Sequence, residues 1–526
     1  MPTLTFPRKE LEKLTGKSVK ELDFSSIKAE ATVLGAEMKV ELEDTNRPDL
    51  WSVEGIARQF KKKRRYKVSG KAGVVDARSA PKIRPYIAAS VVKELKLDDA
   101  AIKSIMLAQE KLDETVGRDR KVTSIGLYRF DKLDMPLVYT TTKSDESAFV
   151  PLGFRRMMTP SEILTEHPKG LEYGHIIEGG KRFPVFKDAK GKVLSLPPVT
   201  NSDDLGKVDE DTKNVLVEVT GTDKREVSRV LTLITLCLAD RGGKIFSVDV
   251  DYGDRKETYP KLKPIKVRVN IGEMESLLGF RVKELKTLLA KMHYDIVSSK
   301  NGELVVEAPP YRWDIMHPVD VFEDVAVAYG FDRIEPRDPK VATYGELDQN
   351  ELLSDKVREI LIGIPLVETI GMVLTNPTFQ RYSMNLEKLK LVEIMNPMSG
   401  SYSCLRAWIL PSLIEFLSKN THRDYPQSIF EVGEVVVPSG SYLGSDTKLK
   451  VSCMIAKSDA TFTEIKKVLD ALLRSFGKKY GVKRLNHGSF IKGRCGSVVV
   501  SGRKAGIVGE VHPHVLENWG IKVPVC

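Results

Sequence analysis

The sequence lacks the features that would place a protein in a membrane or outside the cell. No segment runs for about 18 residues without a polar or charged side chain, which is close to the length that a helix needs to cross a bilayer. The start, Met1 to Leu4, lacks the basic and apolar zones of a secretion signal. We therefore expect a cytoplasmic protein that makes no membrane contact.

Cysteine is scarce and several chemical motifs are missing. The five cysteines are scattered, odd in number and never paired as CxxC, which excludes a disulfide framework and a thiolate zinc site. Glycine-rich phosphate loops, dinucleotide-binding patterns and H-E-x-x-H metal motifs are also missing. The cysteines are therefore expected to be reduced, and any chemistry must rest on other side chains.

The remaining composition is that of a basic protein with several folded domains. The 526 residues are 41% hydrophobic and 29% charged, and the formal net charge is +10. A chain of this length exceeds a single hydrophobic core. The basic excess favours a phosphate-rich partner, and its densest part is the segment 61–71. A solvated loop or helix end is the alternative interpretation of that segment.

Changes in pattern along the chain predict four regions. In 86–260, β-rich runs alternate with helical patterns, and two prolines follow in 259–264. The next part predicts strand, helix, helix, hairpin and helix, with Asn301-Gly302 as the hairpin turn. We expect a mixed α/β unit with the basic segment (1–85), an α+β domain (86–260), a winged-helix-like module (261–338) and a second α+β domain (339–526). The strands expected within 86–260 are 86–92, 137–142, 215–219 and 244–250, and the helices are 98–116 and 224–240.

Three long segments are similar to one enzyme family. They occur in the family's order, and with their surroundings they cover essentially the whole chain. The segments are Glu43 to Arg58, Pro310 to Ile334 and Asn396 to Glu434. The sequence thus resembles the β subunit of phenylalanyl-tRNA synthetases. The length leaves no room for the inserted oligonucleotide-binding fold and the carboxy-terminal anticodon-binding domain of bacterial β subunits, so the resemblance is to the archaeal/eukaryotic type.

The resemblance implies a multidomain α+β protein with an editing-like second domain and a class II synthetase-like carboxy-terminal domain. It also implies an α subunit as partner, in an (αβ)₂ heterotetramer that attaches phenylalanine to tRNA(Phe) with ATP. Neither an F/H-R-x-E motif nor a G-x-G-x-G-x-R motif occurs after residue 340. Because class II enzymes bind the phosphates of ATP with these arginines, we expect the ATP site on the α subunit.

Four acids, Asp314, Asp320, Glu323 and Asp324, predict a magnesium site. Pro318 suits a first helical turn, so the last three would share one helix face. Their repulsion would be offset by a hard cation, and oxygen ligands favour Mg²⁺ over zinc. The resemblance implies that this ion is shared with the α subunit. Two alternatives remain open: the acids complement the helix dipole, or Arg312 and Arg333 neutralise them.

A second site is implied by the resemblance at Ser195, Asn201, Glu218 and Thr220. These positions correspond to a domain that hydrolyses tyrosyl-tRNA(Phe) formed in error. The residue pattern alone is also typical of a turn at Pro197-Pro198 and of an exposed acid in a Val-rich strand at Glu218. Two other functions are weighed against the β-subunit interpretation: a free-standing nucleic-acid-binding protein and a free-standing trans-editing hydrolase.

Overall fold

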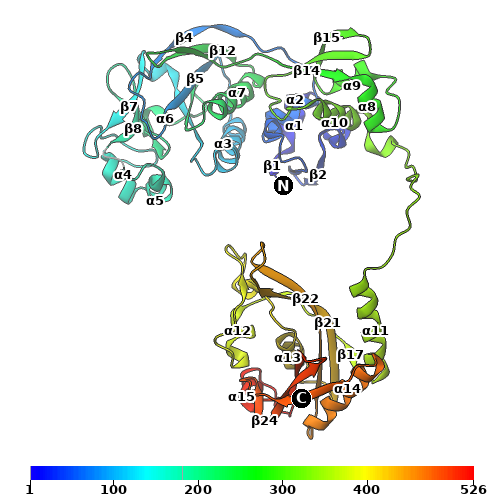
Figure 1. Cartoon of the computed structure of the whole chain (residues 1–526). Coiled ribbons are helices and arrows are strands. Elements are labelled where there is room, and N and C mark those ends of the chain that lie inside the picture. Colours follow the sequence, from blue (N-terminus) through cyan, green and yellow to red (C-terminus); the bar gives the residue numbers. More distant parts are fainter. Residues whose placement is uncertain (1, 180–181) are drawn as a thin grey trace. The chain divides into compact units, whose positions relative to one another are not determined.

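The computed structural model describes residues 2–179 and 182–526. These form two compact units, one that ends at Asp338 and one that runs from Pro339 to Cys526. Residues 335–348, which join them, have no regular secondary structure and are drawn as a thin loop in Figure 1. Pro336 and Pro339 oppose helix and strand in this stretch. A multidomain α+β protein with several sheets is confirmed, whereas the division into four regions stays a prediction.

The first part of the chain forms a small antiparallel sheet with two helices. The sheet order is β1-β3-β2 and Ser52 caps the second helix by accepting a hydrogen bond from the Gly55 amide. A Cβ on Gly55 would lie 1.8 Å from the Asp49 carbonyl oxygen, so only glycine fits there. The elements are β1 (Thr3–Pro7), α1 (Arg8–Thr15), β2 (Ala29–Leu34), β3 (Glu37–Leu42) and α2 (Val53–Gln59).

A ten-stranded mixed sheet dominates the first unit. Its order is β10-β9-β8-β7-β4-β12-β5-β11-β6, with β13 paired to β12, and only the β12–β4 and β4–β7 pairs are parallel. The predicted strands 86–92, 137–142, 215–219 and 244–250 are all present within a residue or two. The strands are β4 (Val68–Asp76), β5 (Tyr86–Lys93), β6 (Thr123–Arg129), β7 (Leu137–Thr142), β8 (Phe183–Lys187), β9 (Val193–Leu196), β10 (Thr200–Asn201), β11 (Val215–Gly221), β12 (Lys244–Asp251) and β13 (Lys256–Tyr259).

Two long helices cover this sheet and explain why its central strands are apolar. Helix α7 (Lys224–Asp240), predicted with these bounds, packs on β5 and β11, and α3 (Asp99–Glu114) packs on α7 and β6. Asp223 and Asp98 cap the two helices through backbone amides. Shorter helices are α4 (Pro160–Glu166), α5 (Pro168–Tyr173) and α6 (Asp203–Gly206). Strand β4, assigned to the first region by the sequence, belongs to this sheet, and one core continues from Leu4 to Trp313.

The last part of the first unit has the element order predicted from the sequence. Asn301 and Gly302 have φ values of 51° and 79° and close the hairpin between two antiparallel strands. His317 and Asp320 form a capping box at the helix that Pro318 begins. The elements are β14 (Ile265–Asn270), α8 (Ile271–Leu278), α9 (Leu285–Lys291), β15 (Asp295–Lys300), β16 (Glu303–Ala308) and α10 (Pro318–Tyr329).

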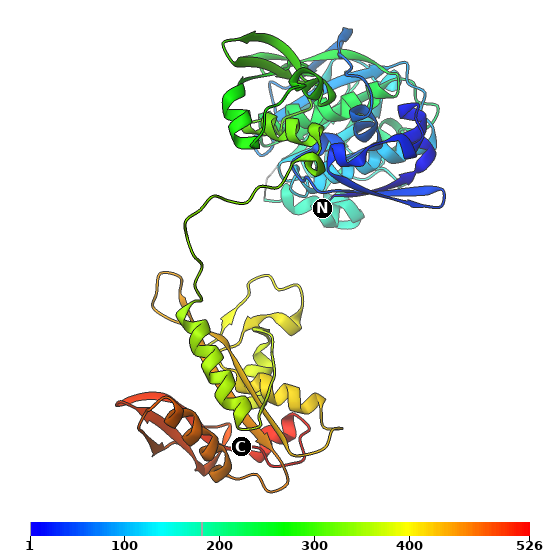
Figure 2. The same cartoon turned by 90° about the vertical axis from the view of Figure 1, so that its right-hand side faces the viewer.

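The second unit combines three small sheets with helices. In Figure 2, α11 lies beside the long β21–β22 pair, and it contacts β17, β21 and α14. Its elements are α11 (Gln349–Gly363), β17 (Val367–Glu368), β18 (Leu374–Thr375), α12 (Pro377–Gln380), β19 (Val392–Glu393), β20 (Cys404–Leu405), α13 (Leu410–Lys419), β21 (Gln427–Pro438), β22 (Ser445–Ala456), α14 (Phe462–Ser475), β23 (Tyr480–Arg484), β24 (Phe490–Val500), β25 (Arg503–Val511) and α15 (Pro513–Asn518). The five cysteines are unpaired, and no helix of the described residues is long and apolar enough to cross a membrane.

Candidate functional site

A cavity of about 380 Å³ opens in the first unit between the large sheet and α3. This volume falls in the range of small-molecule sites, roughly 300 to 1,000 Å³. Polar groups of Ser195, Asn201 and Glu218 lie among mainly apolar walls. The apolar lining includes Ile102, Ile105, Met106, Leu127, Leu152 and Val199. Three of the four residues predicted for the second site therefore line one cavity.

Glu218 is the buried acid of this cavity. It lies in β11 opposite Gly126 of β6 and Ala89 of β5, two small residues that leave room for its side chain. Only 2% of Glu218 is exposed, which excludes the alternative of an exposed strand acid. Burial raises the pKa of Glu218 to about 7, although hydrogen bonding by Tyr128 and the charge of Arg84 act to lower it. Its Oε1 accepts no hydrogen bond from any described residue.

Tyr128 joins the polar groups of the cavity. Its hydroxyl lies 3.0 Å from Glu218 Oε2, 2.9 Å from Ser195 Oγ and 3.3 Å from Asn201 Oδ1. Tyr128 lies in β6, at one end of the sheet order, and Ser195 and Asn201 pair with each other in β9 and β10 at the other end. The sheet therefore curls until its two ends meet across a single buried hydroxyl.

Thr220 supports the site from beside the cavity. Its hydroxyl accepts a hydrogen bond from Arg84 Nε at 2.9 Å and lies 3.2 Å from Ser124 Oγ. Arg84 is 1% exposed and also donates to the carbonyl oxygens of Thr220 and Arg120. Thr220 is not among the residues that line the cavity. Through these contacts Thr220 ties Arg84 to β11, and its role in the second site stays a prediction.

A second buried acid and an arginine shape the cavity wall. Asp113 of α3 is 4% exposed, and burial raises its pKa to about 7 against the opposing charges of Arg120 and Arg84. The Asp113 carboxylate lies 3.3 Å from Arg120 Nε, and Arg120 Nη1 donates to the carbonyls of Pro198 and Val199 at 3.1 and 3.2 Å. This pair fixes the turn that carries the apolar Val199 into the cavity.

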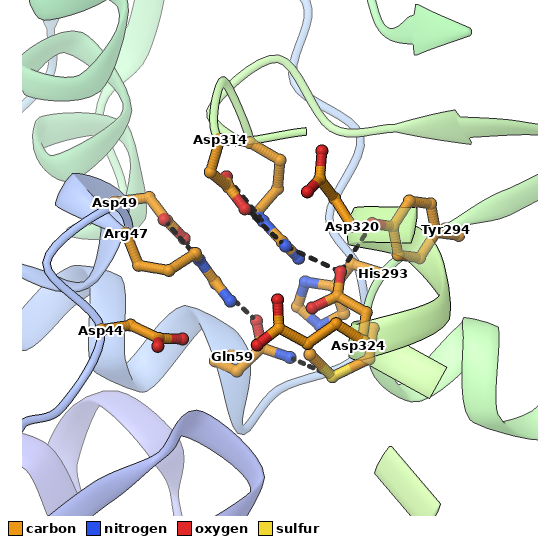
Figure 3. A network of polar contacts seen from close by, with 12 residues as sticks. Asp44, Arg47, Asp49, Gln59, His293, Tyr294, Asp314, Asp320 and Asp324 are labelled. Carbon is orange, nitrogen blue, oxygen red and sulfur yellow. Dashed lines mark hydrogen bonds and ion pairs between the residues drawn. The ribbon is translucent and has the colours of Figure 1, made fainter. Parts of the chain in front are cut away.

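The four acids predicted for a metal line a second, much smaller space of about 20 Å³, together with Asp44. This volume is about that of one water-sized sphere. Figure 3 shows Asp44 from the N-terminal segment facing Asp314, Asp320 and Asp324 from the later segment. The space also has three cationic neighbours: Lys28, Arg47 and Arg312.

These cations and backbone amides already engage most of the acid oxygens. Arg312, 1% exposed, pairs with Asp314 at 2.8 Å and with Asp324 at 2.7 Å, and Lys28 pairs with Glu323. Asp320 accepts from the amides of residues 316 and 317 at 2.7 Å, as expected for a helix-dipole partner. Across the described residues, no three His, Cys, Asp or Glu side chains converge closely enough to hold a metal. The oxygen ligands suit Mg²⁺ chemically, and the site stays a prediction.

The basic segment is bound largely to its own chain. Lys63 and Arg65 pair with Asp295 at 2.8 and 3.3 Å, and Arg64 donates to the Ala239 carbonyl at 2.7 Å. Lys61, Lys62 and Lys67 remain exposed, and the Arg65 side chain is 84% exposed despite its ion pair. These contacts favour a structural role for the segment, and its binding of RNA stays a prediction.

Comparisons with known proteins agree across the whole chain. Residues 334–526 match the phenylalanyl tRNA synthetase beta chain CLM domain, and residues 267–331 match the tRNA synthetase B5 domain. The phenylalanine–tRNA ligase beta subunits of Thermococcus onnurineus and Pyrococcus horikoshii are 42% and 41% identical to this chain. The alignments cover all of it and 97% and 98% of the relatives. The chain belongs to the phenylalanine–tRNA ligase β-subunit family.

A solved structure supports the same assignment. A crystal structure of an N-terminal fragment of the phenylalanyl-tRNA synthetase beta subunit from Pyrococcus horikoshii matches with a TM-score of 0.59 and 36% identity. The match covers 62% of this chain and 99% of the fragment. The family resemblance stated from the sequence is thus confirmed.

Sequence reasoning missed Tyr128, Arg84 and the Asp113–Arg120 pair. Tyr128 lies in an apolar strand, where its pattern is that of an ordinary core aromatic. Asp113 lies near the end of a helix that is otherwise rich in charge. Nothing local distinguishes these residues, because Tyr128, Arg84 and Arg120 contact groups from strands or loops far away in the sequence.

Proposed function

We propose that this chain is the β subunit of a phenylalanine–tRNA ligase that works with an α subunit as an (αβ)₂ heterotetramer. The assembly attaches phenylalanine to tRNA(Phe), converts ATP to AMP and pyrophosphate, and hydrolyses mischarged tyrosyl-tRNA(Phe). Family membership supports the role of this chain in ligation. In the second unit, Ile370, Met395, Met398 and Tyr442 are almost fully exposed, which supports a partner that covers them.

The ligation site belongs to the α subunit in this proposal. The arginine motifs that bind ATP are missing from the second unit. In strand β21, Glu431 is 3% exposed and its carboxylate pairs with Arg406 at 2.6 Å. Arg406 itself is 2% exposed and also donates to the Glu434 carbonyl, so it is not free to hold a phosphate. The second unit is a scaffold.

The editing proposal rests on one observation: the buried Glu218 carboxylate has an unpaired Oε1 beside an apolar cavity. A pocket built for an apolar ring excludes an added hydroxyl only weakly, so a second site that requires the hydroxyl is needed. A tyrosyl ring would place a phenol donor on Oε1. A phenylalanyl ring would leave that oxygen without a partner, at a cost of roughly 1–3 kcal/mol.

The other residues predicted for this site have positioning roles. Asn201 and Ser195 would orient the ester and a water molecule, and Thr220 would hold β11. A side-chain nucleophile is not required in this mechanism. Because Glu218 binds the side chain of the substrate and Asn201 the reacting end, their loss should affect different steps.

The test compares two variants of the αβ assembly. Glu218→Ala should abolish hydrolysis of tyrosyl-tRNA and spare phenylalanine ligation, whereas Asn201→Ala should slow hydrolysis more than it changes the amino-acid preference. Glu303→Ala, at an exposed acid in strand β16, is the matched control and should change neither activity. Undiminished clearance of tyrosyl-tRNA by Glu218→Ala would refute the editing role.

A magnesium ion at Asp314, Asp320, Glu323 and Asp324 is also part of the proposal. Glu323 has half of its side chain exposed, whereas Asp314 and Asp324 share the single positive charge of Arg312. The ion would replace Lys28 as the partner of Glu323 and neutralise the acids near a subunit boundary. Mg²⁺ keeps several waters, so one or two carboxylates suffice to hold it.

Co-purification separates this proposal from its two rivals. A stable stoichiometric partner is required here, and the chain alone should show no phenylalanine-dependent pyrophosphate exchange. A free-standing trans-editing hydrolase would instead clear tyrosyl-tRNA without a partner, and a nucleic-acid-binding protein would show neither activity. Robust exchange by the purified single chain would contradict the assignment of ligation to the α subunit.

A further inference from the structure

The hydroxyl of Tyr128 has three polar neighbours but only one proton. A tyrosine hydroxyl donates one hydrogen bond and accepts up to two. Its neighbours are Glu218 Oε2 at 3.0 Å, Ser195 Oγ at 2.9 Å and Asn201 Oδ1 at 3.3 Å. Tyr128 is fully buried, so water cannot complete the set. Each group in this cluster must therefore act as donor or acceptor in a way that gives every hydrogen bond a single proton.

The order follows from the chemistry of each group. Above its pKa of about 7, Glu218 is ionised and only accepts hydrogen bonds, so in this state the Tyr128 O–H must point to Glu218. Ser195 then donates its own proton to the Tyr128 oxygen. The Asn201 amide can turn its NH₂ group toward the same oxygen, because the two ends of an amide are nearly equal in shape. The result is a directed chain of hydrogen bonds, in which Ser195 donates to Tyr128 and Tyr128 donates to Glu218.

We propose that Tyr128 is the specificity-determining positioning residue of this cavity, because it occupies Glu218 Oε2 and leaves Oε1 as the single acceptor for a substrate phenol. This inference rests on the editing role proposed above. Gly126 and Ala89 flank Glu218 with almost no side chain, so the hydrogen bond from Tyr128 is the main side-chain contact that orients the carboxylate. The directed chain also turns the Ser195 proton away from the cavity. Ser195 thus presents lone pairs, which suit the protonated amino group of an aminoacyl ester.

Loss of the Tyr128 hydroxyl should have two linked effects on the αβ assembly. Tyr128→Phe should lower kcat/KM for tyrosyl-tRNA hydrolysis about ten- to hundredfold at pH 7, the range for a lost hydrogen bond to a charged group. It should also move the acidic limb of the pH profile upward, because a carboxylate without its donor protonates more easily. Activity should then recover in part at higher pH.

Other titratable or charged groups near Glu218 stay in place in the Tyr128→Phe variant. They are Arg84 before β5, Asp113 on α3 and Tyr139 on β7. Tyr139→Phe is the matched control: Tyr139 is equally buried and contacts the same Phe186 ring, but its hydroxyl donates to the Arg84 carbonyl. The Tyr139→Phe variant keeps both Asp113 and the hydrogen bond from Tyr128 to Glu218. The acidic limb of its pH profile should therefore match that of the wild type. A common shift in both variants would overturn the inference.

A second substitution separates the loss of the hydrogen bond from an effect of misfolding. Incorporation of 2,3-difluorotyrosine at position 128 keeps the shape and makes a stronger donor, so the acidic limb should move downward. Opposite shifts in the two variants support the inference. No shift in the fluorinated protein, or an equal loss of activity by Tyr128→Phe at every pH, overturns it. If the wild-type assembly fails to hydrolyse tyrosyl-tRNA, the editing function itself is refuted.

Discussion

One added methyl group at Gly126 should disable the cavity without changing any polar residue. Gly126 lies in β6 directly opposite Glu218. A Cβ there would lie 2.3 Å from the Tyr128 hydroxyl oxygen and 2.5 Å from Glu218 Oε2, whereas ordinary contact begins at 3.4 Å. The difference of 3.4 − 2.3 Å means that the hydroxyl must move by about 1 Å. Displacements of this size cost roughly a hundredfold in rate when they misplace a reacting or recognising group.

The energetic cost should be moderate. Overpacking a close-packed site costs about 1–3 kcal/mol, and replacing glycine stabilises the folded chain by about 0.4–1 kcal/mol through the unfolded state. We therefore expect Gly126→Ala to lower the free energy of unfolding by about 1–2 kcal/mol. Most of the protein should stay folded, so the loss of editing can be measured.

The assay is deacylation of tyrosyl-tRNA by the αβ assembly, with phenylalanine ligation measured in parallel. Hydrolysis should fall about a hundredfold, and ligation should be retained. Gly506→Ala, in strand β25, is the control, because a Cβ there meets nothing within 4 Å. Wild-type hydrolysis by a folded Gly126→Ala protein would show that Tyr128 and Glu218 need not hold these positions.

Three further predictions test the buried charges. In the folded state the pKa of Glu218 is about 7 rather than 4.5, so the native protein holds a proton that the unfolded chain releases, and stability falls as pH rises through this window. Glu218→Gln should remove this pH dependence, so between pH 4 and pH 8 its free energy of unfolding should rise relative to that of the wild type by up to about 3 kcal/mol. Urea unfolding at each pH measures this difference, and an unchanged pH dependence in the variant contradicts burial of Glu218 as the cause. Arg312→Met should lower the free energy of unfolding by about 3–5 kcal/mol, because Asp314 and Asp324 lose their buried partner. A decrease below about 1 kcal/mol in the same assay would argue against this role of Arg312. Mg²⁺ should raise the thermal midpoint of the wild-type assembly but not of Asp320→Ala/Glu323→Ala, and absence of a Mn²⁺ anomalous peak near these residues favours the helix-dipole alternative.

Local patterns in the sequence predicted the secondary structure well. Helix α7 and strand β7 have the predicted bounds, because apolar periodicity, Asp223 as a cap and β-branched residues act within a few residues of each other. Asn301-Gly302 specified its hairpin because both turn positions need φ values above zero. The family assignment also came from the sequence, since long motifs in order carry more information than short ones.

Tertiary structure decided which of these residues act together. A period-two pattern cannot tell whether Glu218 faces solvent, because β11 is buried on both faces by elements far away in the sequence. The curl of the sheet brings Tyr128 of β6 to Ser195 of β9, a contact between residues 67 positions apart. The acids around α10 show the same limit: spacing placed Asp320, Glu323 and Asp324 on one helix. Which of their charges remain free depends on Arg312 and Lys28, which come from other parts of the chain. Chain pattern sets local conformation through short-range sterics and hydrogen bonds, whereas burial, pKa and pairing depend on what the folded chain packs against each group.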